Sequence, residues 1–474
     1  MKQELLRIDH VHVVRDGEEK LRDLNMWIGA GEIVGLTATD RHGLNTFLEL
    51  IEKNLPLVDG HVYFEGQPVN SYLKPGKGDN KVYIINNKSK LIPALTVADN
   101  VLVLRKGFRK YVISERVLET QVQETFDQLG ISICAAALAD RLTTYERLVV
   151  ELIKAVLSGR RLIVLVGISE ILGFDELNNF YDLLRYYAGE GFGILYIGNH
   201  HEEVFRICNR FLLYQSGKII KTVYAEDMDD AHITPFVEQI KQQKTITTGA
   251  RIPVLAMRSV TTGKLKNLTF TLYRGECLTV LDRDNYVMAE FLELLKGRTP
   301  EQGSMEWGKE LMIIPEDPLN NYLFRDQSYL FNLSFDVDKK VGKSVIPRRI
   351  KDSILREWET EIGDVKDVKT LESLPKTRLY DLICLKILLY HPPLVVLVQP
   401  FSGVDMHMRI HIADLIWRLK EARVSVLLLT SYVADTLAVT DEMILLEKGI
   451  MVSEEELLKS QFIKNNYYKD RFIK

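Results

Sequence analysis

Cysteine, long apolar runs and excess basic charge are scarce in this chain, and each scarcity excludes a class of protein. Only four cysteines occur, and none of them forms a C-x-x-C pair, so neither a disulfide framework nor a cysteine-based metal site is expected. No apolar run approaches the roughly 20 residues that a membrane-spanning helix needs, and the first residues lack the apolar core of a signal peptide. The formal net charge of −4 offers no basic excess to nucleic acid or to an anionic membrane. We therefore expect a cytoplasmic protein that reaches the inner face of the cell membrane only through a partner.

What the sequence does contain is an internal repeat. Four landmarks recur in the same order, two of them 244 positions further on and two of them 232 positions further on. The pairs are GEIVGL and GECLTV at Gly31 and Gly275, FLEL at Phe47 and Phe291, IVLV and VVLV at Ile163 and Val395, and the glycines Gly217 and Gly449. Two copies of one unit, the second shorter in its middle, explain a shared order with only two offsets.

The repeat sets the expected domain bounds. Residues 1–240 form the first domain, the polar stretch 241–250 has the composition of a linker, and residues 251–474 form the second domain with a C-terminal tail. In each copy a β-rich start leads to an apolar strand, a turn and a helix. A helical middle follows, and then apolar strands that alternate with helices. Such alternation predicts an α/β fold with a mainly parallel sheet that helices cover on both faces.

In this order of elements the chain resembles the double ATP-binding-cassette subunits of ribose/galactose-type sugar importers. The resemblance rests on residues 91–103 (LIPALTVADNVLV), 200–220 (HHEEVFRICNRFLLYQSGKII), 313–324 (IIPEDPLNNYLF) and 399–416 (QPFSGVDMHMRIHIADLI). It implies two P-loop NTPase-like cassettes in tandem, each with a β-rich N-terminal part and a helical subdomain, able to pair as an intramolecular pseudo-twofold dimer. It also implies a membrane permease as partner, because residues 91–103 lie near the permease-facing surface in related importers.

The first phosphate loop of this family pattern is incomplete. A P-loop needs glycines whose amides cradle phosphate, a lysine for the β- and γ-phosphates and a hydroxyl for Mg²⁺. The turn at 38–46 reads ATDRHGLNT. Gly43 and Thr46 survive, Leu44 stands in the place of the lysine, and Asn45 replaces the magnesium hydroxyl. With Asn87 near the Q-loop position, these residues are predicted to be the remnant of a nucleotide site.

The second phosphate loop departs further. It places Asp282, Asn285 and Val287 at glycine positions and Met288 at the basic position. Asp282 and Asp284 are expected to direct negative charge at any phosphate group. We predict that this loop repels a triphosphate.

The positions that the resemblance assigns to catalysis have also lost their chemistry. A cassette uses an aspartate for the Mg²⁺ shell, a following glutamate that polarises the attacking water, and a switch histidine. These places are held by Val166, Gly167 and Asn199 in the first copy and by Val398, Gln399 and Ser431 in the second. The signature segments LTTYE and LPKTR carry Tyr145 and Lys376 where glycine lets backbone approach phosphate. We predict no catalytic residue, metal site or cofactor, and weak binding of ATP and Mg²⁺ stays open.

Three functions follow as hypotheses. The preferred one is a pseudo-ATPase that serves as a scaffold or regulatory partner of a sugar-import or sugar-sensing membrane complex, bound to a permease-like or sensory protein. The second is a functional ATP-binding, energy-coupling subunit of a carbohydrate importer. The third is a cytoplasmic regulator that binds nucleotide or another anion without hydrolysis, through Gly43, Thr46 and His42. The first is preferred because about three lost hydrogen bonds to charged groups, at roughly 1.5–3 kcal/mol each, weaken binding on the order of 10⁴-fold.

Overall fold

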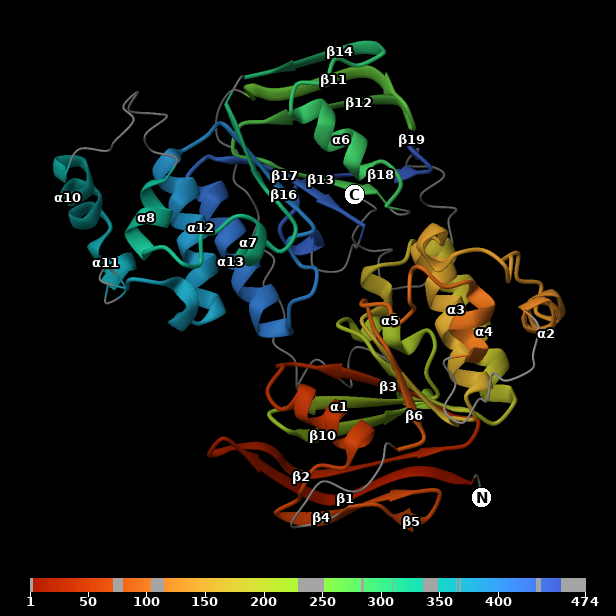
Figure 1. The fold of residues 1–474 in the computed structure, drawn as a ribbon. Helices are drawn as coiled ribbons and strands as arrows, with labels where there is room; N and C mark the ends of the chain where they lie inside the picture. Colours follow the sequence, from red (N-terminus) through yellow and green to blue (C-terminus); the bar gives the residue numbers. More distant parts are fainter. Residues whose placement is uncertain are drawn as a thin grey trace. The chain divides into compact units, whose positions relative to one another are not determined.

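The computed structural model describes most of the chain as two compact units (Figure 1). The described residues are 3–70, 80–103, 115–228, 251–282, 285–308, 310–335, 348–363, 365, 368–431 and 436–452. The units divide as Met1–Val237 and Glu238–Lys474. The predicted linker at 241–250, the tail beyond residue 452 and Asp284 lie outside the described residues. The predicted domain bounds of 1–240 and 251–474 therefore stay predictions.

The described part of the first unit contains two sheets. Four strands, β1 (Glu4–Arg15), β2 (Glu18–Gly29), β4 (Asp59–Phe64) and β5 (Gln67–Pro68), form an antiparallel sheet in the order β2-β1-β4-β5. The second sheet has the order β10-β9-β3-β8-β7-β6. Its strands are β3 (Ile33–Ala38), β6 (Val82–Ile85), β7 (Leu162–Val166), β8 (Gly193–Ile197), β9 (Arg210–Gln215) and β10 (Lys218–Tyr224). All neighbours in it run parallel except β10, which pairs antiparallel with β9.

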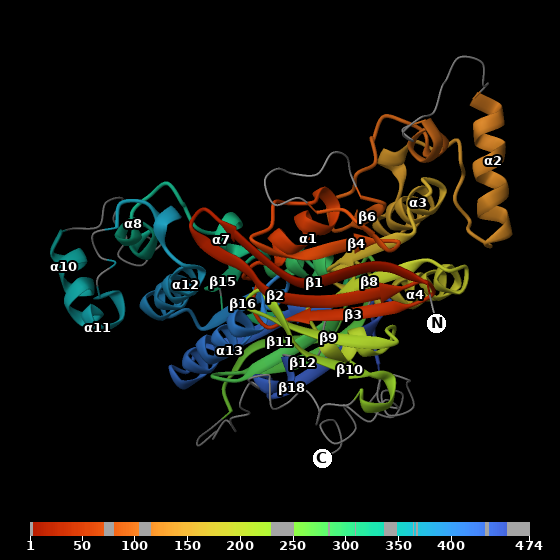
Figure 2. The same ribbon diagram turned by 90° about the horizontal axis from the view of Figure 1, so that it is seen from below.

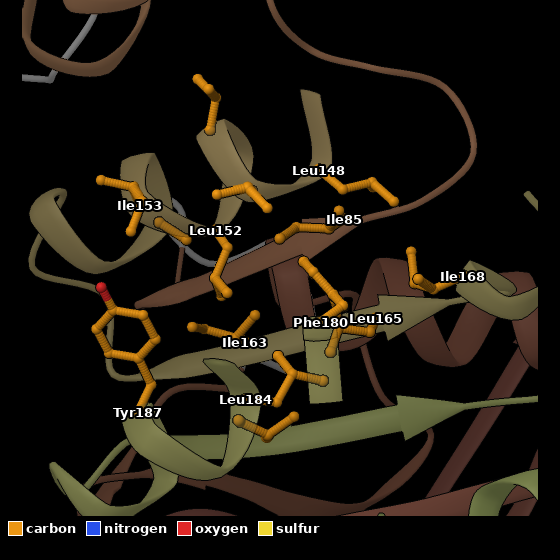
Figure 3. Packing of buried hydrophobic residues seen from close by; sticks show 14 of the residues in the cluster. Ile85, Leu148, Leu152, Ile153, Ile163, Leu165, Ile168, Phe180, Leu184 and Tyr187 are labelled. Atoms are coloured by element: carbon orange, nitrogen blue, oxygen red, sulfur yellow. The ribbon is translucent and has the colours of Figure 1, made fainter. Parts of the chain in front are cut away.

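Helices cover this parallel sheet on both faces. They are α1 (Leu44–Lys53), α3 (Thr144–Leu157), α4 (Phe174–Gly189) and α5 (His201–Phe205). The helix α2 (Glu115–Gln128) packs instead against residues 99–103. One core cluster joins α3 and α4 to the sheet, and Figure 3 shows Leu152 of α3 and Leu184 of α4 beside Ile163 of β7. A second cluster packs α1 between the two sheets. The near-continuous apolar strands β3, β7 and β8 are buried because both faces are covered.

The second unit repeats this architecture in one larger sheet. Its order is β14-β11-β12-β19-β18-β13-β17-β16-β15 among the described strands. The strands are β11 (Pro253–Thr262), β12 (Leu265–Tyr273), β13 (Cys277–Asp282), β14 (Gln302–Trp307), β15 (Leu311–Ile314), β16 (Leu394–Val398), β17 (Ser425–Thr430), β18 (Glu442–Glu447) and β19 (Ile450–Met451). The strands β15, β16, β17, β13 and β18 run parallel.

The helices of the second unit fall into two groups. Beside the sheet lie α6 (Met288–Leu295), α12 (Lys376–Tyr390) and α13 (Met406–Glu421). The short helices α7 (Pro318–Asn321), α8 (Tyr329–Ser334), α10 (Arg348–Glu357) and α11 (Glu359–Ile362) belong to the helical part. Both views show α8, α10 and α11 gathered beyond α12 at one side of the unit (Figures 1 and 2). The predicted helical subdomain is therefore present.

The repeat is visible in matching side-chain contacts. In the first unit Asn209 Oδ1 accepts a hydrogen bond from the Ile33 amide at 2.9 Å. In the second unit Asp441 Oδ2 accepts from the Cys277 amide at 2.7 Å. The helices α3 and α4 begin 232 positions before α12 and α13. The predicted duplication and the predicted α/β class with mainly parallel sheets are confirmed.

No helix within the described part of the chain has both the length and the apolar character required to cross a membrane.

Candidate functional site

Close packing against β2 explains the glycine that survives at the first phosphate-loop position. Gly43 has φ 71°, and a Cβ there would overlap the Lys20 carbonyl oxygen and lie 2.8 Å from the Tyr214 hydroxyl. This glycine is therefore required by the close approach of the turn to β2, whether or not phosphate binds. Of the other predicted remnants, Leu44 is half-buried, Asn45 is exposed, and Thr46 is buried without capping α1.

The rest of this loop is held by internal hydrogen bonds. The Asp40 carboxylate accepts from the His42 amide at 2.9 Å and from the Ser216 amide at 3.0 Å. The Tyr214 hydroxyl donates to the His42 carbonyl at 2.8 Å, and His42 Nε2 lies 2.7 Å from the Glu19 carbonyl oxygen. The loop is thus tied to β2 and to the β9–β10 hairpin, and an acidic side chain takes part in that tie.

The second phosphate-loop position contains its own anion. Asp282, at the end of β13, is 2% exposed, and its Oδ2 accepts from the amides of Val287 at 2.7 Å and Met288 at 2.9 Å. These amides begin α6, where the helix dipole favours negative charge and where a P-loop would hold phosphate. The Asp282 carboxylate, expected to direct negative charge at a phosphate group, thus lies on the amides that such a group would use.

At the catalytic position of the second unit the two predicted residues bind each other. Gln399 follows Val398 at the end of β16 and has φ 48°. Its Nε2 donates to Ser431 Oγ at 2.9 Å, and its Oε1 accepts from the Ser431 amide and from Thr430 Oγ1, each at 3.3 Å. The amide group of Gln399 is therefore used inside the protein, and it carries no negative charge to polarise water.

The first unit has a related arrangement with a residue that the sequence did not predict. Asn199 Nδ2 donates to Glu170 Oε1. Gly167 follows Val166 at the end of β7 with φ 65°, and a Cβ on Gly167 would lie 3.5 Å from Glu170 Cδ. A carboxylate from three residues downstream thus occupies space beside the position that lacks its own side chain. In the sequence, the acidic residue Glu170 shortly after the apolar strand was the available sign of this carboxylate; in the structure it lies in the short 3-10 helix η3 (Ile168–Glu170).

A buried carboxylate lies behind this arrangement. Glu203, on α5, is buried, and its Oε1 accepts from the hydroxyl of Tyr181 at 3.1 Å and from that of Tyr196. Burial raises the pKa of Glu203 above its ordinary value, and hydrogen bonds from Ser169 and the two tyrosines oppose that rise. This cluster was also missed, because neither tyrosine is near Glu203 in the sequence.

The signature segments serve as helix starts. In the first unit Thr143 and Glu146 form a reciprocal capping box on α3, with distances of 2.8 and 3.2 Å. Tyr145 is half-buried, and burial raises the pKa of its phenol. Lys376 opens α12 in the second unit after Pro375. Neither start offers the glycine that close approach to phosphate needs. The Q-loop candidate Asn87 is exposed, two residues beyond the end of β6.

A loop built around Asn100 is preserved in the first unit. The Asn100 side chain is fully buried; its Oδ1 accepts from the Ile92 amide at 2.7 Å, and its Nδ2 donates to the Ile92 carbonyl and the Thr96 carbonyl, each at 3.0 Å. Thr96 Oγ1 accepts from the Asp99 amide at 3.1 Å and so caps the π-helix η1 (Asp99–Val103). This closed loop leaves the Ile92 side chain 42% exposed.

The same loop occurs in the second unit. Asn332, also fully buried, accepts from the Phe324 amide at 2.8 Å and donates to the carbonyls of Phe324 at 2.9 Å and Ser328 at 3.1 Å. Phe324, Ser328 and Asn332 stand 232 positions after Ile92, Thr96 and Asn100, respectively. Phe324 is 41% exposed, and its ring lies 5.8 Å from that of Phe331 and 4.7 Å from that of Phe335. Both loops therefore present apolar surface on a rigid frame.

Comparisons with known proteins agree with this fold and this repeat. No family model matches the chain. A putative ribose/galactose/methyl galactoside import ATP-binding protein of Hahella chejuensis is 22% identical, over 94% of this chain and 91% of that protein. The ribose import ATP-binding protein RbsA of Bacillus cereus is 21% identical, over 92% of each. The arabinose import ATP-binding protein AraG of Azospirillum brasilense is 23% identical, over 95% of this chain and 91% of that protein.

Solved structures give the fold independently. The archaeal ribosome recycling factor aABCE1, in complex with the ribosomal stalk protein aP1, superimposes with a TM-score of 0.59 at 16% identity, covering 97% of this chain and 92% of that chain. A structure of the RNase-L inhibitor also gives 0.59 at 16% identity, covering 95% and 92%. The two units have the fold of ATP-binding-cassette domains of the P-loop NTPase type. The chain is related to the ATP-binding subunits of ribose/galactose-type sugar importers, as its sequence predicted.

Proposed function

We propose that this chain is a pseudo-ATPase: a pair of cassettes, residues 1–240 and 251–474, that no longer hydrolyses ATP and serves as a scaffold or regulatory partner of a sugar-import or sugar-sensing membrane complex. The observation that carries the proposal is the internal use of the groups at the former nucleotide sites. The Asp282 carboxylate occupies the amides that begin α6, and Gln399 is bonded to Ser431.

The negative charge of Asp282 opposes phosphate binding at the second phosphate loop. A phosphate group that approached the start of α6 would have to displace the Asp282 carboxylate, or lie beside it with like charge in a buried place. Displacement exposes a carboxylate that has two amide donors at 2.7 and 2.9 Å, and hydrogen bonds to a charged group contribute about 1.5–3 kcal/mol each. Even weak binding of ATP and Mg²⁺ at this loop would therefore require free energy to displace the Asp282 carboxylate before a phosphate group could contact the amides.

A retained surface supports a partner role. The loops around Asn100 and Asn332 have matching hydrogen bonds and hold Ile92 and Phe324 exposed. Sugar-import cassettes work with membrane permeases, and in the importers that this chain resembles the segment corresponding to residues 91–103 lies near the permease-facing surface. We propose a permease-like or sensory membrane protein as the partner, which would hold the chain at the inner face of the membrane.

One observation favours a second candidate function, an energy-coupling subunit that still turns over ATP. Glu170 brings a carboxylate beside Gly167, in contact with Asn199, and a carboxylate near that position is what water activation requires. The first unit would then act with Glu170 in place of the missing glutamate. Under the preferred proposal, Glu170 only fills the space and binds Asn199.

Partner binding is testable by co-expression with a sugar permease from the same organism and purification through the permease. Phe324→Asp places a charge on the exposed loop and should reduce recovery of the chain at least fivefold. Tyr286→Asp changes a similarly exposed aromatic residue, 43% exposed, away from that loop, and serves as the matched control. Equal recovery of the wild type and both variants would end the proposed use of this surface.

A further inference from the structure

The two units differ in how they fill the space between the helix pair and the sheet. In the first unit Phe180 and Tyr187 of α4 pack into this layer, and both are buried (Figure 3). At the equivalent places in α13, 232 positions later, the second unit has Ile412 and Leu419. Two aromatic rings are therefore replaced by smaller aliphatic side chains.

The facing helix differs in both directions. Cys384 of α12 replaces Leu152 of α3, a further loss, whereas Tyr380 and Ile387 replace Leu148 and Ala155 and are gains. Among these differently shaped side chains lies a cavity of about 50 Å³, bounded by α12, α13 and the end of β16. Residues that line it include Ile383, Cys384, Ile387, Ile412, Ile416 and Leu419.

The lining of this cavity is apolar. Among the described residues around it, only the Tyr380 hydroxyl and the Cys384 thiol are polar side-chain groups, and none of these residues is Asp, Glu, Lys, Arg or His. Burial raises the pKa of Tyr380 and of Cys384 to about 12, so both stay neutral at physiological pH. The volume exceeds the 10–15 Å³ that one water needs, but a stable buried water also needs about two to four polar partners. Apolar occupants are therefore favoured over water.

We infer that the second unit binds a small, uncharged, apolar molecule in this cavity, between α12 and α13. Its size limit follows from comparison with an engineered cavity of about 150 Å³ that holds benzene; one third of that volume suits a xenon atom or a hydrocarbon group of about three carbons. The site is independent of the proposed partner role. Since α12 begins at Lys376 and α13 is capped by Asp405, an occupant contacts one helix that starts at the signature segment and one that starts within residues 399–416.

Xenon is a direct probe of the proposed site, because it is apolar and fits the volume. We expect saturable binding to the full chain in ¹²⁹Xe NMR. Ile412→Phe copies Phe180 of the first unit and fills the cavity from α13. Cys384→Leu copies Leu152 and fills it from α12. Each variant that retains native circular dichroism should bind xenon at least tenfold more weakly than the wild type.

A substitution in the first unit tests whether the smaller side chain at this place on the helix is what creates the xenon site. Phe180→Ile removes a ring from the first unit at the equivalent place and should create a second xenon site. Two results would overturn the inference: no saturable xenon binding by the wild type, or undiminished binding by a natively folded Ile412→Phe or Cys384→Leu chain. Because the two filling variants come from different helices, failure of one to fold leaves the other to decide.

Discussion

Gln399 Nε2 lies 2.9 Å from Ser431 Oγ and donates a hydrogen bond to it. These are the residues at the places of the water-polarising glutamate and the switch histidine in the second unit. In the first unit the switch position, Asn199, donates to Glu170. Each central sheet thus has a side-chain hydrogen bond between the segments that follow two neighbouring strands, β7 and β8 in the first unit and β16 and β17 in the second.

Asp282→Ala should destabilise the second unit. The substitution removes the acceptor for two amides at the start of α6, and loss of a helix cap costs about 1–2 kcal/mol. Chemical denaturation monitored by circular dichroism measures the change. Asp405→Ala, which removes the acceptor for the Met408 amide on α13, is the matched control and should cost a similar amount. An unchanged or raised stability of Asp282→Ala would contradict the assigned role.

Glu203 should make the first unit less stable as pH rises. Burial raises the pKa of Glu203 in the folded chain, so its contribution is complete below the unfolded pKa of about 4.5 and is lost as pH rises through the higher folded value. Glu203→Gln removes this titration. The free energy of unfolding of the variant, minus that of the wild type, should increase between pH 4 and pH 8. Glu124→Gln changes an exposed glutamate of α2 and should give a pH-independent difference.

A pH dependence of the same direction is expected from His411 in the second unit. Its Nε2 lies 2.8 Å from Asp381 Oδ1, joining α13 to α12, and the hydrogen bond to Asp381 raises the pKa of His411. The resulting stability is complete below the unfolded pKa of about 6.5 and is lost as pH rises through the higher folded value. His411→Gln should lower the unfolding free energy by on the order of 1 kcal/mol at pH 5.5 and by less at pH 8.5. A larger loss at pH 8.5 would contradict this pairing.

The buried asparagines should each be needed for the loops they close. Asn100→Ala leaves the Ile92 amide and two carbonyls without their side-chain partner, and an unsatisfied buried polar group costs about 1–3 kcal/mol. Asn332→Ala should behave alike in the second unit. Asn45→Ala, at an exposed position, should change stability by less than about 0.5 kcal/mol. Thermal unfolding of the three variants separates these outcomes.

The sequence predicts the architecture well because periodic apolar strands and a fixed offset are properties of the chain itself. The offset of 232 matches α3 to α12 and α4 to α13. The orientation of single side chains is a different problem. Asp282 was expected to direct negative charge at phosphate; that its carboxylate accepts hydrogen bonds from the amides of Val287 and Met288 depends on how the loop folds and was not predicted.

Two further features lie beyond sequence reasoning for related reasons. Glu170 is three residues away from the position that the family pattern assigns to a carboxylate, and only the turn after β7 brings it beside Gly167. The apolar cavity is lined by side chains of two helices, where Phe180 to Ile412 is a loss of volume and Leu148 to Tyr380 and Ala155 to Ile387 are gains. Volumes of this kind are set by packing in three dimensions.

Release of inorganic phosphate from Mg·ATP by the purified full chain tests the central claim most directly. The wild type and Glu170→Gln are measured side by side at millimolar Mg·ATP, and a related sugar-import ATPase serves as the positive control. The pseudo-ATPase proposal predicts no release above buffer from either chain and no nucleotide-dependent shift in melting temperature. Appreciable release by the wild type that Glu170→Gln abolishes would contradict it and would identify the first unit as a working ATPase.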